Sequence, residues 1–156
     1  MRRKDREVVD EKKICEIIDK CHCCRVDFYD NGEIYIVPLN FGYTKNDFGY
    51  IFYFHGAIAG RKYELLEKNP NVGFELDTSY KLKEGEMACN YSAYYQSIIG
   101  TGKASIIDNT DEKIKGLSLI MEKETGKKDW EFRPEMLEKV CVFKIDVDSL
   151  SCKENI

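Results

Sequence analysis

Residues 21–24, read CHCC, place three cysteines and one of the two histidines side by side. Thiolate and imidazole are ligands that structural zinc prefers, and clustered thiols can also serve redox chemistry. Structural zinc needs four ligands, usually as two spaced pairs, and the other cysteines are scattered along the chain. Because cysteine is often buried without a chemical role, the pattern favours packing at a junction between two elements. We therefore expect no metal site.

Residues 55–66, HGAIAGRKYELL, lead from an aromatic segment through two glycines into Arg61 and Lys62. If a helix starts there, its free N–H groups, its dipole and an arginine fork could bind a phosphate. The plainer alternative, a solvated cationic helix face, stays open from the residues alone. His55 lies beside this turn and is a candidate catalytic residue, although a lone histidine is more often structural.

Gly102-Lys103 in the segment IIGTGKAS is similar to part of a phosphate-binding P-loop. That motif requires a glycine five residues before the Gly-Lys pair and a hydroxyl residue directly after it. Ser97 and Ala104 occupy those positions. The P-loop is excluded, and no GxGxxG motif for a dinucleotide is present.

The elements that must position these residues begin with a helix. Asp10 is its expected N-cap, and an apolar face follows at Ile14, Ile17, Ile18 and Cys21. A strand starts at Cys24, and Asn31-Gly32 predicts a hairpin turn. The return strand, residues 34–43, contains Pro38, so we expect it to be interrupted there or to lie at a sheet edge.

A third strand is predicted at residues 50–55 and a helix ending at Asn69-Pro70. The rest of the predicted pattern is a strand at 72–77, a loop at 78–90, a long strand with a bulge at 94–107, a helix capped by Asn109 or Thr110, a short helix beginning at Pro134 and a closing strand at 140–147. Strands joined by short turns favour an antiparallel sheet or barrel over a parallel one. We expect a mainly β, α+β fold with peripheral helices, in a single domain over residues 1–156.

Composition narrows the function classes. The 156 residues carry a net charge of −4, which argues against general binding to nucleic acid or to anionic membranes. No run of 18 apolar residues predicts a membrane helix, and the first residues lack the apolar core of a secretory signal. Seven cysteines without an export signal suit a reducing cytoplasm, where we expect the protein to reside.

Three segments, YIVPLNFGY, YFHGAIAGRKYELLEKNP and YYQSIIGTGKA, together resemble the blocks of the pyridoxamine 5′-phosphate oxidase-like flavoproteins. The nitroimidazole-resistance (Nim) branch is the most similar, and the resemblance covers nearly the whole chain. It implies a split β-barrel that binds FMN at the interface of a homodimer.

The resemblance also assigns roles to residues. Residues 37–41 would line the isoalloxazine ring, Arg61 and Lys62 would contact the flavin phosphate, and Gln96 with Ser97 would approach from the second subunit. The implied cofactor residues are Pro38, Leu39, Asn40, Phe41, His55, Gly56, Arg61, Lys62, Gln96 and Ser97. Many relatives carry Arg-Ser where this chain has Gln96-Ser97, so one positive charge is lost there.

The expected function is that of an FMN-dependent oxidoreductase reducing small substrates, with nitroaromatic compounds as one class. The flavin would carry the redox chemistry, and His55 could orient the substrate or donate a proton. Three alternatives stay open: a non-catalytic flavin carrier or sensor, a heme-binding relative using His22 or His55, and a pyridoxamine-phosphate oxidase proper. The last needs further basic groups, and the C-terminal SCKENI offers only Lys153.

Overall fold

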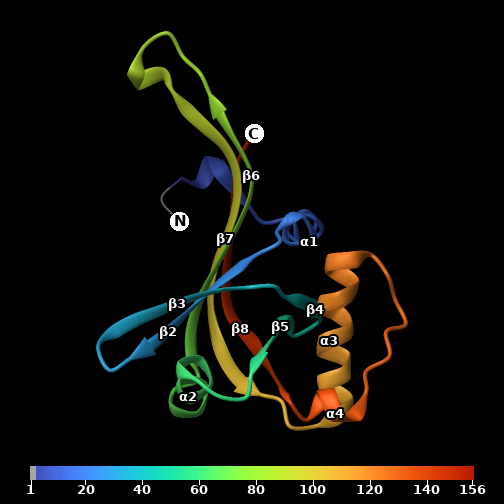
Figure 1. Cartoon of the computed structure of the whole chain (residues 1–156). Helices are drawn as coiled ribbons and strands as arrows, with labels where there is room; N and C mark the ends of the chain where they lie inside the picture. The colour runs from blue at the N-terminus through green and yellow to red at the C-terminus, as the bar shows by residue number, and fades with distance from the viewer. Residues whose placement is uncertain (1–2) are drawn as a thin grey trace.

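An antiparallel sheet of eight strands forms most of the protein in the computed structural model, which describes residues 3–156 (Figure 1). The strands are β1 (Glu7–Val8), β2 (Cys24–Asp30), β3 (Glu33–Leu39), β4 (Gly42–Asn46), β5 (Gly49–Ala57), β6 (Asn71–Lys83), β7 (Ser92–Ile106) and β8 (Val140–Asn155). Their spatial order is β3-β2-β6-β7-β8-β5-β4, with β1 paired to β8. β3 pairs only with β2, and β4 only with β5, so the sheet curls without closing. This confirms the split antiparallel architecture.

Four α-helices lie around the sheet: α1 (Glu11–Lys20), α2 (Arg61–Lys68), α3 (Thr110–Thr125) and α4 (Pro134–Leu137). The predicted N-caps are confirmed, because Asp10 Oδ1 accepts a hydrogen bond from the Lys12 N–H at 2.9 Å, and Asn109 Oδ1 accepts one from the Glu112 N–H at 2.9 Å. Each cap satisfies a backbone donor that the first helical turn leaves free. No helix within residues 3–156 has the length and apolar character needed to cross a membrane.

The β2–β3 hairpin turns at Asn31-Gly32, where both residues have the positive φ predicted for a type I′ turn (50° and 99°). Pro38 lies within β3, an edge strand, so its missing N–H costs no ladder bond. The predicted strand 34–43 is in fact two strands, because the chain leaves β3 after Leu39 and begins β4 at Gly42.

The predicted loop at residues 78–90 is wrong. β6 continues to Lys83 and β7 begins at Ser92, with a short 3₁₀-helix, η2 (Ala88–Asn90), between them. The register shifts between Thr78 and Lys81, and past this bulge the two strands pair only with each other. Residues 79–95, called the arm below, project well beyond the rest of the sheet (Figure 1). The alternation of apolar and polar residues is weak in this segment, because neither face of the arm packs on the core.

The main core lies inside the curled sheet, where α1 and α2 cover it. Phenylalanines dominate it: Phe28, Phe52, Phe54, Phe74 and Phe143 are all buried. A second apolar cluster, built around Tyr53, Leu117 and Val142, packs α3 and α4 against β5 and β8. The two strands β5 and β8 therefore pack against an apolar cluster on each face of the sheet.

Candidate functional site

Lys62, in the first turn of α2, is a half-buried cation with no carboxylate at ion-pair distance among residues 3–156. Its Nζ lies 5.8 Å from the centroid of the Phe143 ring and next to Gly56, where an added Cβ would collide with it. Burial lowers the pKa of the Lys62 ammonium. A cation held in this way gains strongly from an anionic partner.

The start of α2 has donors to offer beside this cation. Gly60 is the N-cap with φ of 99°, and no side chain caps the helix. The backbone N–H groups of the first turn therefore lack the partner that Asp10 and Asn109 give to α1 and α3. The start of α2 therefore places free backbone donors beside a lysine that has no ion-pair partner among the described residues.

Arg61 is differently placed from its neighbour. Its guanidinium forms ion pairs with Asp30 at 2.9 Å and Glu33 at 3.3 Å, and it stacks over the Tyr35 ring at 4.5 Å. These contacts fasten the β2–β3 hairpin to α2. The structure therefore gives Arg61 a defined role at the rim of the site, with its charge already matched.

His55 and Gly56 lie near the end of β5, opposite Val142 and Cys141 of β8. The His55 side chain is exposed, yet the protein around it and the nearby Lys62 both lower the pKa of its imidazole, desolvation being the larger cause. Both effects favour the neutral imidazole. A neutral imidazole beside the half-buried Lys62 can accept or donate a hydrogen bond without adding charge to the site.

Two unpaired strand edges border this region. The outer edge of β3 has no partner strand, and neither has the stretch of β5 from Phe54 to Ala57 on the side away from β8. Between them Phe143 stacks on Phe54 with ring centroids 5.0 Å apart and approaches Phe28 at 6.4 Å. All three rings are buried in the core. We call the region bounded by β3, β5 and the start of α2 the split, and it brings the free backbone groups of two strand edges close to the start of α2.

The segment from Pro38 to Phe41 runs from the end of β3 away from the split. Pro38 is exposed, whereas Phe41 is buried and packs on Phe52 at 5.5 Å. Asn40 donates its Nδ2 to the carbonyl oxygen of His22 at 3.3 Å. Its side chain therefore ties β3 to the connection after α1, and only backbone groups of this segment remain available.

Gln96 and Ser97 lie on β7, far from the other predicted site residues. His55 is level with Ile106 and Ile107 on the neighbouring strands, nine residues further along β7 than Ser97, which is about 30 Å. Gln96 is buried, with Nε2 donating to Glu154 at 2.9 Å and Oε1 accepting from Ser79 at 3.0 Å. Within one chain these two residues do not join the cluster at Lys62.

The Cys21–Cys24 segment connects α1 to β2, as the packing interpretation expected. Cys21 and Cys24 are buried, and desolvation raises the pKa of the Cys21 thiol to about 12. All seven cysteines are free thiols. Within residues 3–156 no group of three or more metal-ligating side chains comes together. Cys21 and Cys24 are part of the core, while His22 is exposed and Cys23 is partly exposed.

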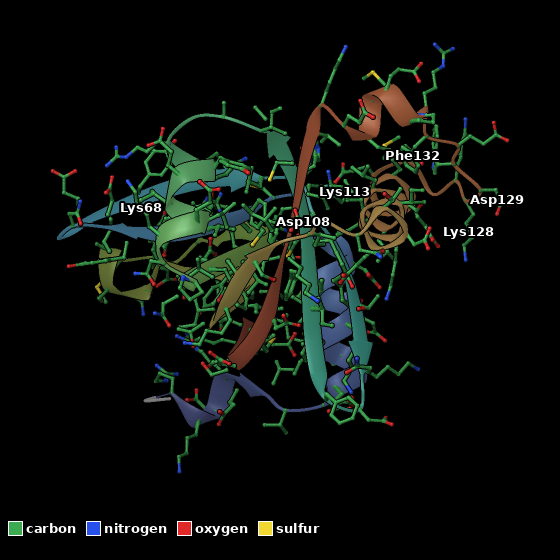
Figure 2. All side chains as sticks on the ribbon, turned by 90° about the horizontal axis from the view of Figure 1, so that it is seen from below. Lys68, Asp108, Lys113, Lys128, Asp129 and Phe132 are labelled. Carbon is green, nitrogen blue, oxygen red and sulfur yellow. The ribbon has the colours of Figure 1, made fainter. Side chains whose placement is uncertain are left out.

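A separate hollow of about 410 Å³ lies between the start of α3 and α4 (Figure 2). Its lining includes Asp108, Lys113 and Phe132. Lys113 donates its Nζ to the carbonyl oxygens of Leu137 and Val140, both at 3.2 Å, so its charge is used to hold α4 in place. This hollow is structural in character.

Sequence reasoning missed the partners that complete the site. Tyr35 under Arg61, Phe143 under Lys62 and the acidic pair Asp30 and Glu33 all come from other strands. Their separation in the chain carries no spacing signal. Only the Asn31-Gly32 turn hinted that Asp30 and Glu33 would be presented together.

Comparisons with known proteins identify the family and relatives of the fold. A solved structure from Bacteroides thetaiotaomicron VPI-5482, provisionally named as a 5-nitroimidazole antibiotic resistance protein, is 32% identical with a TM-score of 0.81, covering 95% of this chain and 86% of that one. The flavocytochrome Anf3 of Azotobacter vinelandii has a TM-score of 0.80 at 20% identity, over 100% of this chain and 72% of that one.

A FAD- and heme-binding protein of Mycobacterium smegmatis has a TM-score of 0.79 at 13% identity, over 96% of this chain and 73% of that one. At such low identity, the second and third structures show likeness of fold alone. No curated relative matches the chain. The model of the pyridoxamine 5′-phosphate oxidase family matches residues 10–154, nearly the entire chain. This protein is therefore a member of the pyridoxamine 5′-phosphate oxidase family.

Proposed function

We propose that the protein is an FMN-dependent oxidoreductase that reduces small nitroaromatic compounds, with FMN bound in the split. The observation that carries this proposal is Lys62, a half-buried lysine without a counter-ion beside an uncapped helix start. A flavin phosphate would satisfy both, since it carries about two negative charges at pH 7. When bound, the flavin supplies the electron-transfer chemistry.

The residues of this chain would bind and orient the cofactor. Lys62 and the first-turn N–H groups of α2 would hold the phosphate, while the free backbone groups of β3 would border the ring. Arg61 keeps the β2–β3 hairpin against α2 and so fixes the width of the split. His55, whose lowered pKa favours the neutral imidazole, would hydrogen-bond to the substrate or to the flavin edge.

The proposed assembly is a homodimer. Gln96 and Ser97 lie about 30 Å along β7 from the level of His55, so they could approach a flavin only from a second copy. The outer face of the sheet also exposes apolar side chains at Tyr29, Ile34, Ile36 and Ile99. A patch of this kind on a soluble protein marks an interaction surface.

Two ligands that differ only in the phosphate test the cofactor assignment. We expect wild-type protein to bind FMN at least tenfold more tightly than riboflavin, and the Lys62→Met variant to bind both equally, measured by quenching of flavin fluorescence. Lys68→Met, at the exposed end of the same helix, is the control and should keep the preference. Equal affinities in the wild type would remove the phosphate from the proposal.

The visible spectrum separates flavin from heme, because a Soret band in the purified protein would assign heme instead. Anaerobic reduction of the bound flavin, followed by a 5-nitroimidazole, then separates an enzyme from a carrier. We expect the acceptor to speed reoxidation severalfold over an acceptor-free sample. Reoxidation at an unchanged rate would indicate a flavin carrier.

A further inference from the structure

Hydrogen bonds at the base of the arm, residues 79–95, fix the direction in which it leaves the sheet. At its base Ser79 has a φ of 60° and donates its Oγ to Gln96, whose Nε2 is bound to Glu154. On the other strand, Asn155 Nδ2 donates to the carbonyl oxygen of Ala93 at 2.6 Å. A buried amide that uses both ends on such bonds fixes the angle at which the arm leaves the sheet.

The arm has one apolar and one basic face. Leu82 lies opposite Ala93, while Lys81 lies opposite Tyr94 and Lys83 opposite Ser92. Because side chains alternate along a strand and opposed residues share a face, one face of the arm carries Tyr80, Leu82, Tyr91 and Ala93. Tyr80 is 71% exposed there, and Met87 at the tip is 63% exposed. An isolated two-stranded hairpin is marginal in water, so an apolar face of this kind needs a partner.

The apolar face of the arm continues the outer face of the sheet. On β7 the outward positions run from Ala93 through Tyr95 and Ser97 to Ile99, while Gln96 and Ile98 are buried on the inner side. The apolar positions of β3, Ile34 and Ile36, lie on this same outer face. One unpartnered surface thus extends from the β2–β3 hairpin to the arm tip.

We propose that the arm of one copy lies over the split of a second copy and forms the outer wall of its flavin pocket. The proposal rests on the homodimeric flavin site proposed above. If Ser97 approaches the flavin of a second copy, the arm, which begins two residues further along β7, lies close to that flavin, and we place it across that copy's β3 edge. Tyr80, Leu82 and Tyr91 then pack on the exposed Ile34 and Ile36 side chains of the other chain.

The area available supports a second copy as the occupant. The four apolar side chains exposed on the outer sheet face offer roughly half of the ~800 Å² per partner that a standard stable interface buries, and the arm supplies a similar share. A twofold dimer uses each surface twice, so two arms close two splits. Met87, flexible and apolar, is suited to form the part of the wall that meets a variable substrate.

Cross-linking through the native Cys89 tests this contact. Cys89 is exposed at the arm tip, and Ile36 lies three strands away and at least 30 Å along the sheet from Ser92, beyond the reach of a short bis-maleimide within one chain. We expect Ile36→Cys to yield covalent dimers with this reagent. The matched control, Ile36→Cys with Cys89→Ser, should yield none.

Each outcome of the cross-linking experiment either supports or overturns the proposed contact of the arm. Covalent dimers in the wild type would show the arms packed tip to tip, and a dimer by sedimentation without the expected cross-link would place the arm elsewhere; either overturns the proposal, as does a monomer. FMN retention is measured on the same samples. Cross-linked dimers that take up no FMN would leave the arm contact standing and remove the flavin function, so the two failures are distinguishable.

Changing the two arm faces separately adds a second measurement. Tyr80→Ser with Leu82→Ser and Tyr91→Ser should raise the dimer dissociation constant at least tenfold and increase quenching of bound FMN by iodide severalfold. Lys81→Ser with Lys83→Ser, on the basic face, should leave both within twofold. Equal behaviour of the two variants would overturn the proposal.

Discussion

The side chains of Lys62 and Lys123 have similar surroundings. Both are half-buried, both lie over a phenylalanine ring, and desolvation lowers the pKa of both ammonium groups. Lys123, on α3, donates its Nζ to the carbonyl oxygens of Asp19 and Cys21 at the end of α1. Among residues 3–156, Lys62 has no such acceptor. Lys123 therefore stabilises the fold, whereas Lys62 is available to bind an anionic ligand.

The Lys62→Met substitution should have the largest effect among the variants that test this difference between the two lysines. We expect the affinity for FMN to fall about 100-fold, because a charge-assisted hydrogen bond of about 3 kcal/mol is lost. The thermal midpoint of the flavin-free protein should stay the same or rise, since an unpaired buried charge is removed. Fluorescence titration and thermal denaturation measure the two effects. A destabilised flavin-free protein would mean that Lys62 is structural like Lys123.

Lys123→Met should behave in the opposite way. Loss of its bonds to the α1 carbonyls lowers the free energy of unfolding by about 1–3 kcal/mol, measured by urea denaturation. Affinity for FMN should stay within twofold of the wild type. Lys127→Met, on the exposed loop after α3, is the control and should change neither quantity. A tenfold loss of FMN affinity in Lys123→Met would contradict the assignment of Lys123 to fold stability alone.

The pH dependence of FMN binding should follow Lys62 alone. The pKa of Lys62 is lowered in the free protein, and a bound phosphate raises it, so FMN binding takes up a proton between the two values. Affinity is therefore full below the lowered pKa of Lys62 in the free protein and falls by up to tenfold per pH unit above it, until the higher pKa of the complex is reached. The flavin phosphate does not titrate there, because its second pKa is about 6. Titration of Lys62→Met should show no such slope, and Lys123→Met should keep it.

Arg61→Ala should have the smallest effect of the series. Its charge is already matched by Asp30 and Glu33 on an exposed surface, where such pairs contribute about 0.2–1 kcal/mol. We expect FMN affinity to fall two- to fivefold, through a looser β2–β3 hairpin. Asp30→Asn should reproduce the same loss without touching the flavin, measured in the same titration. A 100-fold loss in Arg61→Ala alone would make Arg61 the main phosphate contact.

Local structure could be predicted from the sequence more completely than contacts between residues of distant strands. The Asp10 and Asn109 caps, the Asn31-Gly32 turn and the edge position of Pro38 follow from single-residue preferences, and all are present. The arm was missed because its strands bury nothing in their own chain. The difference between Arg61 and Lys62 was also invisible, because it depends on which residues of distant strands lie near each guanidinium or ammonium group.

Pro38 has a consequence for how the outer edge of β3 meets other chains. This edge presents free backbone groups with Ile34 and Ile36 beside them, which is the kind of strand that recruits further chains into aggregates. Proline cannot donate to an added strand, so Pro38 interrupts any hydrogen-bonded ladder that forms along this edge. The edge can therefore still be covered through side-chain packing, as the proposed arm contact requires, while addition of a further strand to the sheet is disfavoured.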